Sequence, residues 1–230
     1  MRRISALMLS AAMSLGVAGE NAAGWAQFDR YSAANDSIIA AAAYPRVVMM
    51  GNSITDVWPE RNSHLFDTNP DIVSRGISGQ TSYQMLLRFS SDVVALHPKI
   101  VVISAGTNDI AENAGPYDEN RTMDNIAAMV DIAKANGITP VIACVLPAGG
   151  FKWRPSITDS MDKIQSLNSR IKAYAVSNGI YFVDYFTPLV NSDHTAMNPD
   201  FAVDTPAVHP NAAGYDIMEI VLLKVLKELK

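Results

Sequence analysis

The sequence contains a single cysteine among its 230 residues, and this scarcity excludes a disulfide bond within the chain. Cys144 lies in an apolar run, Val141–Val145, where an unpaired thiol behaves as a small hydrophobic side chain. We therefore expect Cys144 to belong to the core. Its position in the middle of a predicted strand argues against a catalytic thiol.

Clusters of positive charge are also missing. The net charge is −5, and no basic run occurs beyond Arg2-Arg3. Because nucleic acid is bound mainly through clustered lysine and arginine, we expect no nucleic-acid partner. A glycine-containing turn can also bind phosphate, but no lysine follows Ser53 as a phosphate loop would require.

The apolar run at the start of the chain is shorter than the ~20 residues that cross a bilayer. This run, Ile4–Ala18, follows two arginines and precedes small residues, which is typical of a secretory signal peptide. We expect a signal peptide at residues 1–26, cut after Gly24-Trp25-Ala26, with a cut after Gly19 as the alternative. The mature chain, residues 27–230, is then expected to be periplasmic or secreted without a membrane span. No cysteine stands at the signal exit, so we expect no lipoprotein anchor.

Apolar runs and amphipathic helical stretches alternate through the rest of the chain. The runs are continuously apolar, which is typical of parallel strands covered on both faces. We therefore predict an α/β fold with one domain, a three-layer α/β/α sandwich around a five-stranded parallel sheet. The expected strands are Arg46–Met50, Ile72–Gly76, Ile100–Ser104, Thr139–Val145 and Tyr181–Val183.

Local signals mark the ends of the predicted helices. Asn136-Gly137 and Asn178-Gly179 are each placed to close a helix, because glycine accepts the left-handed conformation found there. Ser160 and Asn211 are placed to act as helix N-caps. Residues 56–70 are expected to be irregular.

The first expected strand is followed directly by Gly51-Asn52-Ser53. The carboxyl ends of parallel strands form the edge where α/β proteins place ligands and chemistry, so Ser53 is a candidate nucleophile. A serine hydroxyl is a weak nucleophile without a base. Of the four histidines, His209 is the best candidate base, because it stands just before the last predicted helix. The other three are expected to be surface or structural residues: His64, His97 and His194.

Four short blocks in sequence order give the chain a family resemblance. They are Gly51–Thr55 with Ser53, Gly76–Thr81 with Gly79, Gly106–Asp109 with Asn108, and His209-Pro210-Asn211. With these blocks the chain resembles the SGNH hydrolases, or GDSL esterase/lipase family, from about residue 28 to residue 230. It is most similar to the branch of platelet-activating-factor acetylhydrolase subunits and carbohydrate acetylesterases. The resemblance implies the flavodoxin-like SGNH hydrolase fold.

The resemblance also implies a serine esterase that needs no cofactor and no metal. Ser53 is then the nucleophile and His209 the base. The oxyanion donors are the backbone N–H groups of Ser53 and Gly79 and the side-chain amide of Asn108. Losing one such donor typically lowers the rate by ~10²–10³-fold.

The chain departs from the family pattern at two positions. Asn52 replaces the usual aspartate, and we expect its side chain to accept local backbone hydrogen bonds. Pro206 stands where an aspartate usually precedes the histidine. Either Asp204 orients His209 instead or a backbone carbonyl does, since the third member mainly fixes the imidazole tautomer. Further candidates for the acid are Asp193 and Asp200, whereas Asp184 is expected to be a structural turn residue.

Trp153-Arg154 lies in a loop expected at the same edge of the sheet. The pair either binds substrate, by stacking on a sugar ring or clamping a polar group, or anchors its own loop. The leading hypothesis is an exported esterase that removes short acyl groups, most simply acetyl, from small esters or acetylated carbohydrate. A lysophospholipase or thioesterase of the same family is the alternative enzyme. A catalytically inert binding module on this fold is the alternative outside enzymes.

Overall fold

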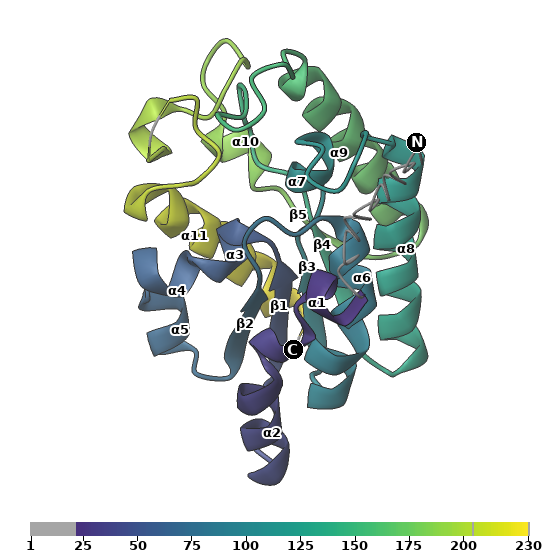
Figure 1. Ribbon diagram of the computed structural model, residues 1–230. Coiled ribbons are helices and arrows are strands. Elements are labelled where there is room, and N and C mark those ends of the chain that lie inside the picture. The colour runs from purple at the N-terminus through teal and green to yellow at the C-terminus, as the bar shows by residue number, and fades with distance from the viewer. Residues whose placement is uncertain (1–21, 204, 230) are drawn as a thin grey trace, which may run out of the picture.

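The computed structural model describes residues 22–203 and 205–229, and Figure 1 shows their arrangement. A single sheet of five parallel strands has the order β2-β1-β3-β4-β5. The strands are β1 (Val47–Gly51), β2 (Ile72–Gly76), β3 (Ile100–Ile103), β4 (Thr139–Ala143) and β5 (Tyr181–Val183). The predicted α/β sandwich with its five-stranded parallel sheet is confirmed.

Two predicted strands end earlier than expected, at Ile103 and Ala143. Ser104 still donates its N–H to the carbonyl of Met50 at 3.0 Å, and Cys144 donates to Val183 at 3.0 Å. Beyond these bonds the chain turns away from the sheet, because it enters the loops at the carboxyl edge. The predicted length of both strands was too great because the prediction followed the apolar sequence, which continues past the end of each strand.

The strands present alternate residues to two separate cores, one on each face of the sheet. Val48 and Met50 pack on one face with α6 (Ser82–Asp92), α8 (Glu119–Ala135) and α9 (Ser160–Ser177). Val47 and Met49 pack on the other face against the remaining large helix, α11 (Ala212–Glu228), and against shorter ones. All four side chains are buried, which explains the continuously apolar strands.

Short helices fill most of the remaining chain. They are α1 (Ala22–Ala26), α2 (Ser32–Ala40), α3 (Ser53–Asp56), α4 (Trp58–Arg61), α5 (His64–Thr68), α7 (Thr107–Ile110) and α10 (Phe186–Leu189), with 3₁₀ turns at Phe28–Arg30, Val94–Leu96 and Pro199–Phe201. The prediction that residues 56–70 are irregular is therefore wrong. Trp58 is buried with its ring centroid 5.0 Å from that of Tyr215 in α11, and such packing stabilises helices too short to form alone.

The helix ends confirm three of the four predicted boundary signals. Gly137 and Gly179 both have left-handed backbone, with φ of 71° and 62°. Asn211 is the N-cap of α11, and its side chain accepts the N–H of Gly214 at 3.0 Å. Ser160 is not an N-cap, because Asp159 occupies that position. The Ser160 hydroxyl instead donates to the carbonyl of Ala148 at 2.7 Å and so ties α9 to the preceding loop.

Candidate active site

The turn after β1 presents Ser53 at the carboxyl edge of the sheet, as the first residue of α3. Asn52 is the N-cap, and its side chain accepts the N–H of Ile54 at 3.0 Å, as predicted. A side chain at Gly51 would place its Cβ 2.1 Å from the hydroxyl of Thr55, so only glycine fits. The turn therefore depends on Gly51 for its close approach and on Asn52 for its cap.

His209 lies beside Ser53, although 156 residues separate them in the sequence. Its Nε2 atom is 2.8 Å from the Oγ atom of Ser53, within hydrogen-bond distance. The histidine segment is held from the other side, because Val203 donates its N–H to the carbonyl of His209 at 3.1 Å and Ala202 pairs with Pro210. The structure thus brings together the two residues predicted as nucleophile and base.

Two of the three candidate acids behind His209, Asp193 and Asp200, lie within the described residues, and the carbonyl of Asp200 accepts the amide of Asn211 at 2.9 Å. Asp204, the first candidate, lies outside the described residues. Asp193 accepts the hydroxyl of Thr195 at 2.9 Å within its own loop. Asp184 accepts the N–H and the hydroxyl of Thr187 at 3.0 and 2.8 Å, which confirms it as a structural turn residue.

Besides Ser53, the two other predicted oxyanion residues lie on two neighbouring segments. Asn108 belongs to α7 and is 3% exposed, and its Nδ2 atom donates to the carbonyl of Gln80 at 2.9 Å. Gly79 has φ of 80°, and a Cβ there would meet nothing within 4 Å. The N–H of Ser78 donates to the carboxylate of Asp56 at 3.0 Å, which ties this loop to the helix that Ser53 begins.

A buried arginine forms hydrogen bonds to the turn before Ser53 and to the loop that contains Gly79. Arg88 in α6 is completely buried and donates to the carbonyl of Gly51 at 3.1 Å, to the side chain of Gln80 at 2.6 Å and to Asp92 at 2.9 Å. Burial lowers the pKa of Arg88, and the hydrogen bond to Asp92 opposes that shift. Sequence reasoning missed this residue. The available signal was an i, i+4 pair of opposite charges, Arg88 and Asp92, beside the apolar residue Phe89.

Replacing Arg88 with methionine is expected to lower the free energy of unfolding by about 3–5 kcal/mol, because the buried Asp92 carboxylate loses its ion-pair partner and keeps the neutral amide of Asn35 as a donor. Urea denaturation followed by circular dichroism measures this loss. Arg121→Met is the matched control, since the Arg121 side chain is 70% exposed, and it should change stability by no more than about 0.5 kcal/mol. Equal stability of the two variants would contradict a supporting role for Arg88.

The other sequence-predicted residues have the structural surroundings expected for them. His64 Nδ1 lies 2.8 Å from a carboxylate oxygen of Glu219, and the His97 ring packs edge-on against Tyr44 with centroids 5.4 Å apart. His194 lies in an exposed turn. Cys144 is buried, and burial raises the pKa of its thiol, as expected for a core cysteine without a catalytic role.

Trp153 and Arg154 form hydrogen bonds to the loop that follows α7. The indole Nε1 of Trp153 donates to Asn113 Oδ1 at 2.8 Å, and Arg154 donates to the carbonyl of Glu112 at 3.4 Å. Trp153 is nevertheless 45% exposed. Anchoring of the loop is therefore present, and nearly half of the Trp153 surface stays exposed. Asn113 was missed by sequence reasoning, because one asparagine in a polar loop carries no local signal.

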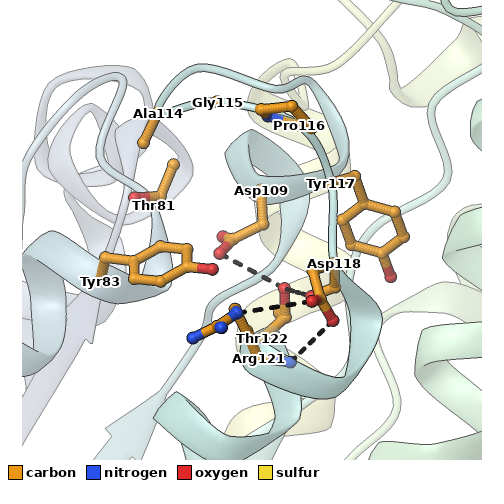
Figure 2. A pocket seen from close by; sticks show the side chains of 10 residues that line it. All are labelled: Thr81, Tyr83, Asp109, Ala114, Gly115, Pro116, Tyr117, Asp118, Arg121 and Thr122. Atoms are coloured by element: carbon orange, nitrogen blue, oxygen red, sulfur yellow. Dashed lines mark hydrogen bonds and ion pairs between the residues drawn. The ribbon is translucent and has the colours of Figure 1, made fainter.

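A cavity of about 530 Å³ lies next to α7, between the start of α6 and the start of α8 (Figure 2). Tyr83, Tyr117 and Arg121 line it, whereas Ser53 and His209 do not. Asp109 also lines it, and its carboxylate accepts the N–H of Ser82 at 3.0 Å at the start of α6. Burial raises the pKa of Asp109. In the described part of the chain, no three His, Cys, Asp or Glu side chains group as a metal site requires.

Comparisons with known proteins agree with this geometry. The sequence model of the GDSL-like Lipase/Acylhydrolase family matches residues 36–217. The chain is 48% identical to a GDSL-like lipase from Bacteroides thetaiotaomicron, with a TM-score of 0.83 over 90% of this chain and all of that one. It is 46% identical to a putative acylhydrolase from Bacteroides fragilis, with a TM-score of 0.84 over 90% of this chain and 99% of that one.

A curated relative gives a shorter match. The chain is 34% identical over 82 residues to a protein of Bacillus subtilis (strain 168) described as the uncharacterized lipoprotein YqeF. The matched region spans about a third of the length of each protein, 34% of both. Within residues 22–203 and 205–229, no helix combines the length and apolarity that a membrane span requires.

Proposed function

The chain belongs to the GDSL-like lipase/acylhydrolase family and is an ester-hydrolysing serine hydrolase, and we propose that it cleaves short acyl esters with Ser53 as nucleophile and His209 as base. The observation that carries the assignment of residues is the 2.8 Å distance between Ser53 Oγ and His209 Nε2. A nucleophile and a base within hydrogen-bond distance are the minimum requirement for acyl transfer by serine.

In the proposed reaction, Ser53 Oγ attacks the ester carbonyl carbon while His209 Nε2 takes the hydroxyl proton. The tetrahedral intermediate collapses when His209 gives this proton to the leaving alcohol, and an acyl–serine ester remains. A water molecule, deprotonated by His209, then attacks the acyl carbon, and the acid is released with Ser53 restored. This order follows the general scheme for serine hydrolases.

The intermediate carries a negative oxygen that needs fixed donors. We assign these donors to the backbone N–H groups of Ser53 and Gly79 and to the Asn108 amide. An amide –NH₂ has two hydrogens, and the bond of Asn108 to Gln80 uses one and orients the other. Ser53 contributes an N–H from the first turn of α3, where helices leave backbone donors without intrahelical partners.

Asp204 is our proposed partner for the second imidazole nitrogen, with a backbone carbonyl as the alternative. Support comes from the chain on either side, since Ala202 pairs with Pro210 and Val203 bonds to the carbonyl of His209. The chain that leads to residue 204 therefore runs alongside the histidine. A carboxylate in that place stabilises the imidazolium formed in each step.

The proposed substrate is a short-chain ester, most simply an acetyl ester, on carbohydrate. The small cavity behind the nucleophile turn is lined by Asn52 and Ile54 but not by Ser53 or His209, and it measures about 10 Å³, so it offers no room for a long acyl chain. Trp153 is partly exposed beside Arg154, and an exposed indole is a group on which a sugar ring can stack.

The test is labelling by a fluorophosphonate together with hydrolysis of p-nitrophenyl esters of two to sixteen carbons and acetate release from a peracetylated sugar. We expect labelling, and kcat/KM highest for the acetate and falling with chain length. If the folded protein is neither labelled nor active, the assignment of Ser53 is wrong. If it is active but prefers long chains, only the short-acyl assignment fails, and the lysophospholipase alternative replaces it.

We also propose that the chain is exported, and the contacts of α1 support the signal cut after Gly19. Ala26 is buried, and its carbonyl accepts the side-chain amide of Gln80 at 2.8 Å. The carbonyl of Trp25 accepts the amide of Gln84 at 3.0 Å. A cut before Gln27 would remove both acceptors, and the buried side-chain –NH₂ of Gln80, beside the proposed oxyanion loop, would lose its bond to Ala26.

If the exported chain is cut after Gly19, as proposed, the mature protein begins at Glu20. Intact-mass measurement of the protein recovered from the periplasm or medium of an expressing bacterium reads the cut directly. A mature mass that begins at Gln27 would instead support the first-predicted boundary at residue 26. Recovery of only the uncut chain inside the cells would remove the case for export.

A further inference from the structure

Asn113 connects the segments of two proposed oxyanion residues, Gly79 and Asn108, to the loop that carries Trp153. Its backbone N–H donates to the carbonyl of Asn108 at 3.0 Å. Its side-chain Nδ2 donates to the carbonyl of Gly79 at 3.1 Å, and its Oδ1 accepts the indole N–H of Trp153 at 2.8 Å. The half-buried Asn113 thus joins its own segment, just after α7, to the segments of Gly79 and Trp153.

The two side-chain bonds are compatible with only one orientation of the Asn113 amide. A backbone carbonyl only accepts hydrogen bonds, and an indole N–H only donates them. The nitrogen must therefore face Gly79 and the oxygen must face Trp153. The reverse orientation would place two acceptors together and two donors together. The bond from Trp153 consequently selects the orientation in which Asn113 donates to Gly79.

Gly79 needs such a bond more than other residues of its loop. Its φ is 80°, and a side chain there would touch nothing within 4 Å, so packing at the Cβ position does not hold this residue. Glycine also has the greatest backbone freedom to lose. The bond from Asn108 holds the next carbonyl, that of Gln80. The bond from Asn113 holds the carbonyl of Gly79 itself, and together they restrict the backbone around the proposed donor.

We propose that Asn113 is a positioning residue for ester hydrolysis, which holds the Gly79 peptide in the oxyanion geometry and is itself oriented by Trp153. The inference rests on the proposed function, because it assumes that the Gly79 N–H contacts the substrate oxygen. Arg154 adds a second bond between the same loops, to the carbonyl of Glu112 at 3.4 Å. Trp153 then influences the rate through Asn113, in addition to any contact that it makes with a sugar.

The test compares kcat and KM for p-nitrophenyl acetate in wild type, Asn113→Ala, Trp153→Phe and the double variant. For Asn113→Ala we expect kcat to fall by about 10- to 100-fold with KM changed by no more than about twofold, because a misplaced donor affects the transition state. Trp153→Phe keeps an aromatic ring but removes the N–H, and should lower kcat by a smaller factor. The double variant should be no slower than Asn113→Ala, because Trp153 acts through Asn113.

Asn136→Ala, at the opposite edge of the sheet, is the matched control and should keep wild-type kcat. Thermal unfolding checks that each variant is folded; if Asn113→Ala does not fold, Trp153→Phe tests the same link with Asn113 in place. Unchanged kcat, a rise in KM alone, or independent losses that multiply in the double variant would each overturn the proposal. An inactive, unlabelled wild type would instead overturn the proposed function, so the two failures are distinguishable.

Discussion

Replacing Ser53 with alanine is expected to lower kcat for p-nitrophenyl acetate by about 10⁴- to 10⁶-fold and to abolish fluorophosphonate labelling. The physical reason is the loss of the nucleophilic oxygen, which lies 2.8 Å from His209 Nε2, so no acyl–enzyme can form. Residual activity over water should come from the oxyanion donors and substrate binding. A steady-state assay and gel fluorescence of the labelled protein measure the two effects.

Ser177→Ala is the matched control for this experiment. Ser177 is exposed at the end of α9, and its hydroxyl donates to the carbonyl of Tyr174 at 3.1 Å, away from the carboxyl edge of the sheet. It should keep wild-type kcat and labelling. If Ser53→Ala is folded by circular dichroism but retains labelling at the wild-type rate, another residue is the nucleophile.

Replacing His209 with alanine is expected to lower kcat by a similar factor, about 10⁴-fold or more. Ser53 remains in place in this variant, but its hydroxyl has no base and is a weak nucleophile at neutral pH. Imidazole added to the buffer should restore part of the activity, because it can occupy the emptied space and accept the proton. A residue that only supported the fold would not be rescued in this way.

The double variant Ser53→Ala, His209→Ala makes the assignment sharper. Residues that act as one unit are strongly non-additive, so the double variant should be no slower than the Ser53→Ala single variant. His97→Asn is the matched histidine control, since His97 lies before β3 at the other edge of the sheet and asparagine tolerates its φ of 45°. Losses that multiply in the double variant would mean that the two residues act in separate steps.

Several features of the fold could be predicted from the sequence because they depend on the burial and backbone preferences of neighbouring residues. Continuous apolar runs predicted the five strands, and Gly137 and Gly179 closed helices where left-handed backbone was required. The misplaced features were those where tertiary contacts replaced local preference. The packing of Trp58 on Tyr215 stabilises short helices in a stretch whose sequence predicts none. The Ser160 hydroxyl donates to the carbonyl of Ala148 and does not cap its own helix.

The sequence by itself determined which chemical groups stand at the carboxyl edge of the sheet: the hydroxyl of Ser53, the glycine at 79, the amide of Asn108 and the imidazole of His209. Ser53 could be located because it follows a strand end, and the resemblance of the four sequence blocks to the SGNH hydrolases indicated the other three positions. Only the tertiary structure decided which groups meet. His209 Nε2 lies 2.8 Å from Ser53 Oγ although the two residues are 156 positions apart in the sequence. The hydrogen bonds of Asn113 to Gly79 and Trp153 likewise join loops from different parts of the chain. Such contacts depend on how loops pack over the finished sheet, and no local pattern encodes them.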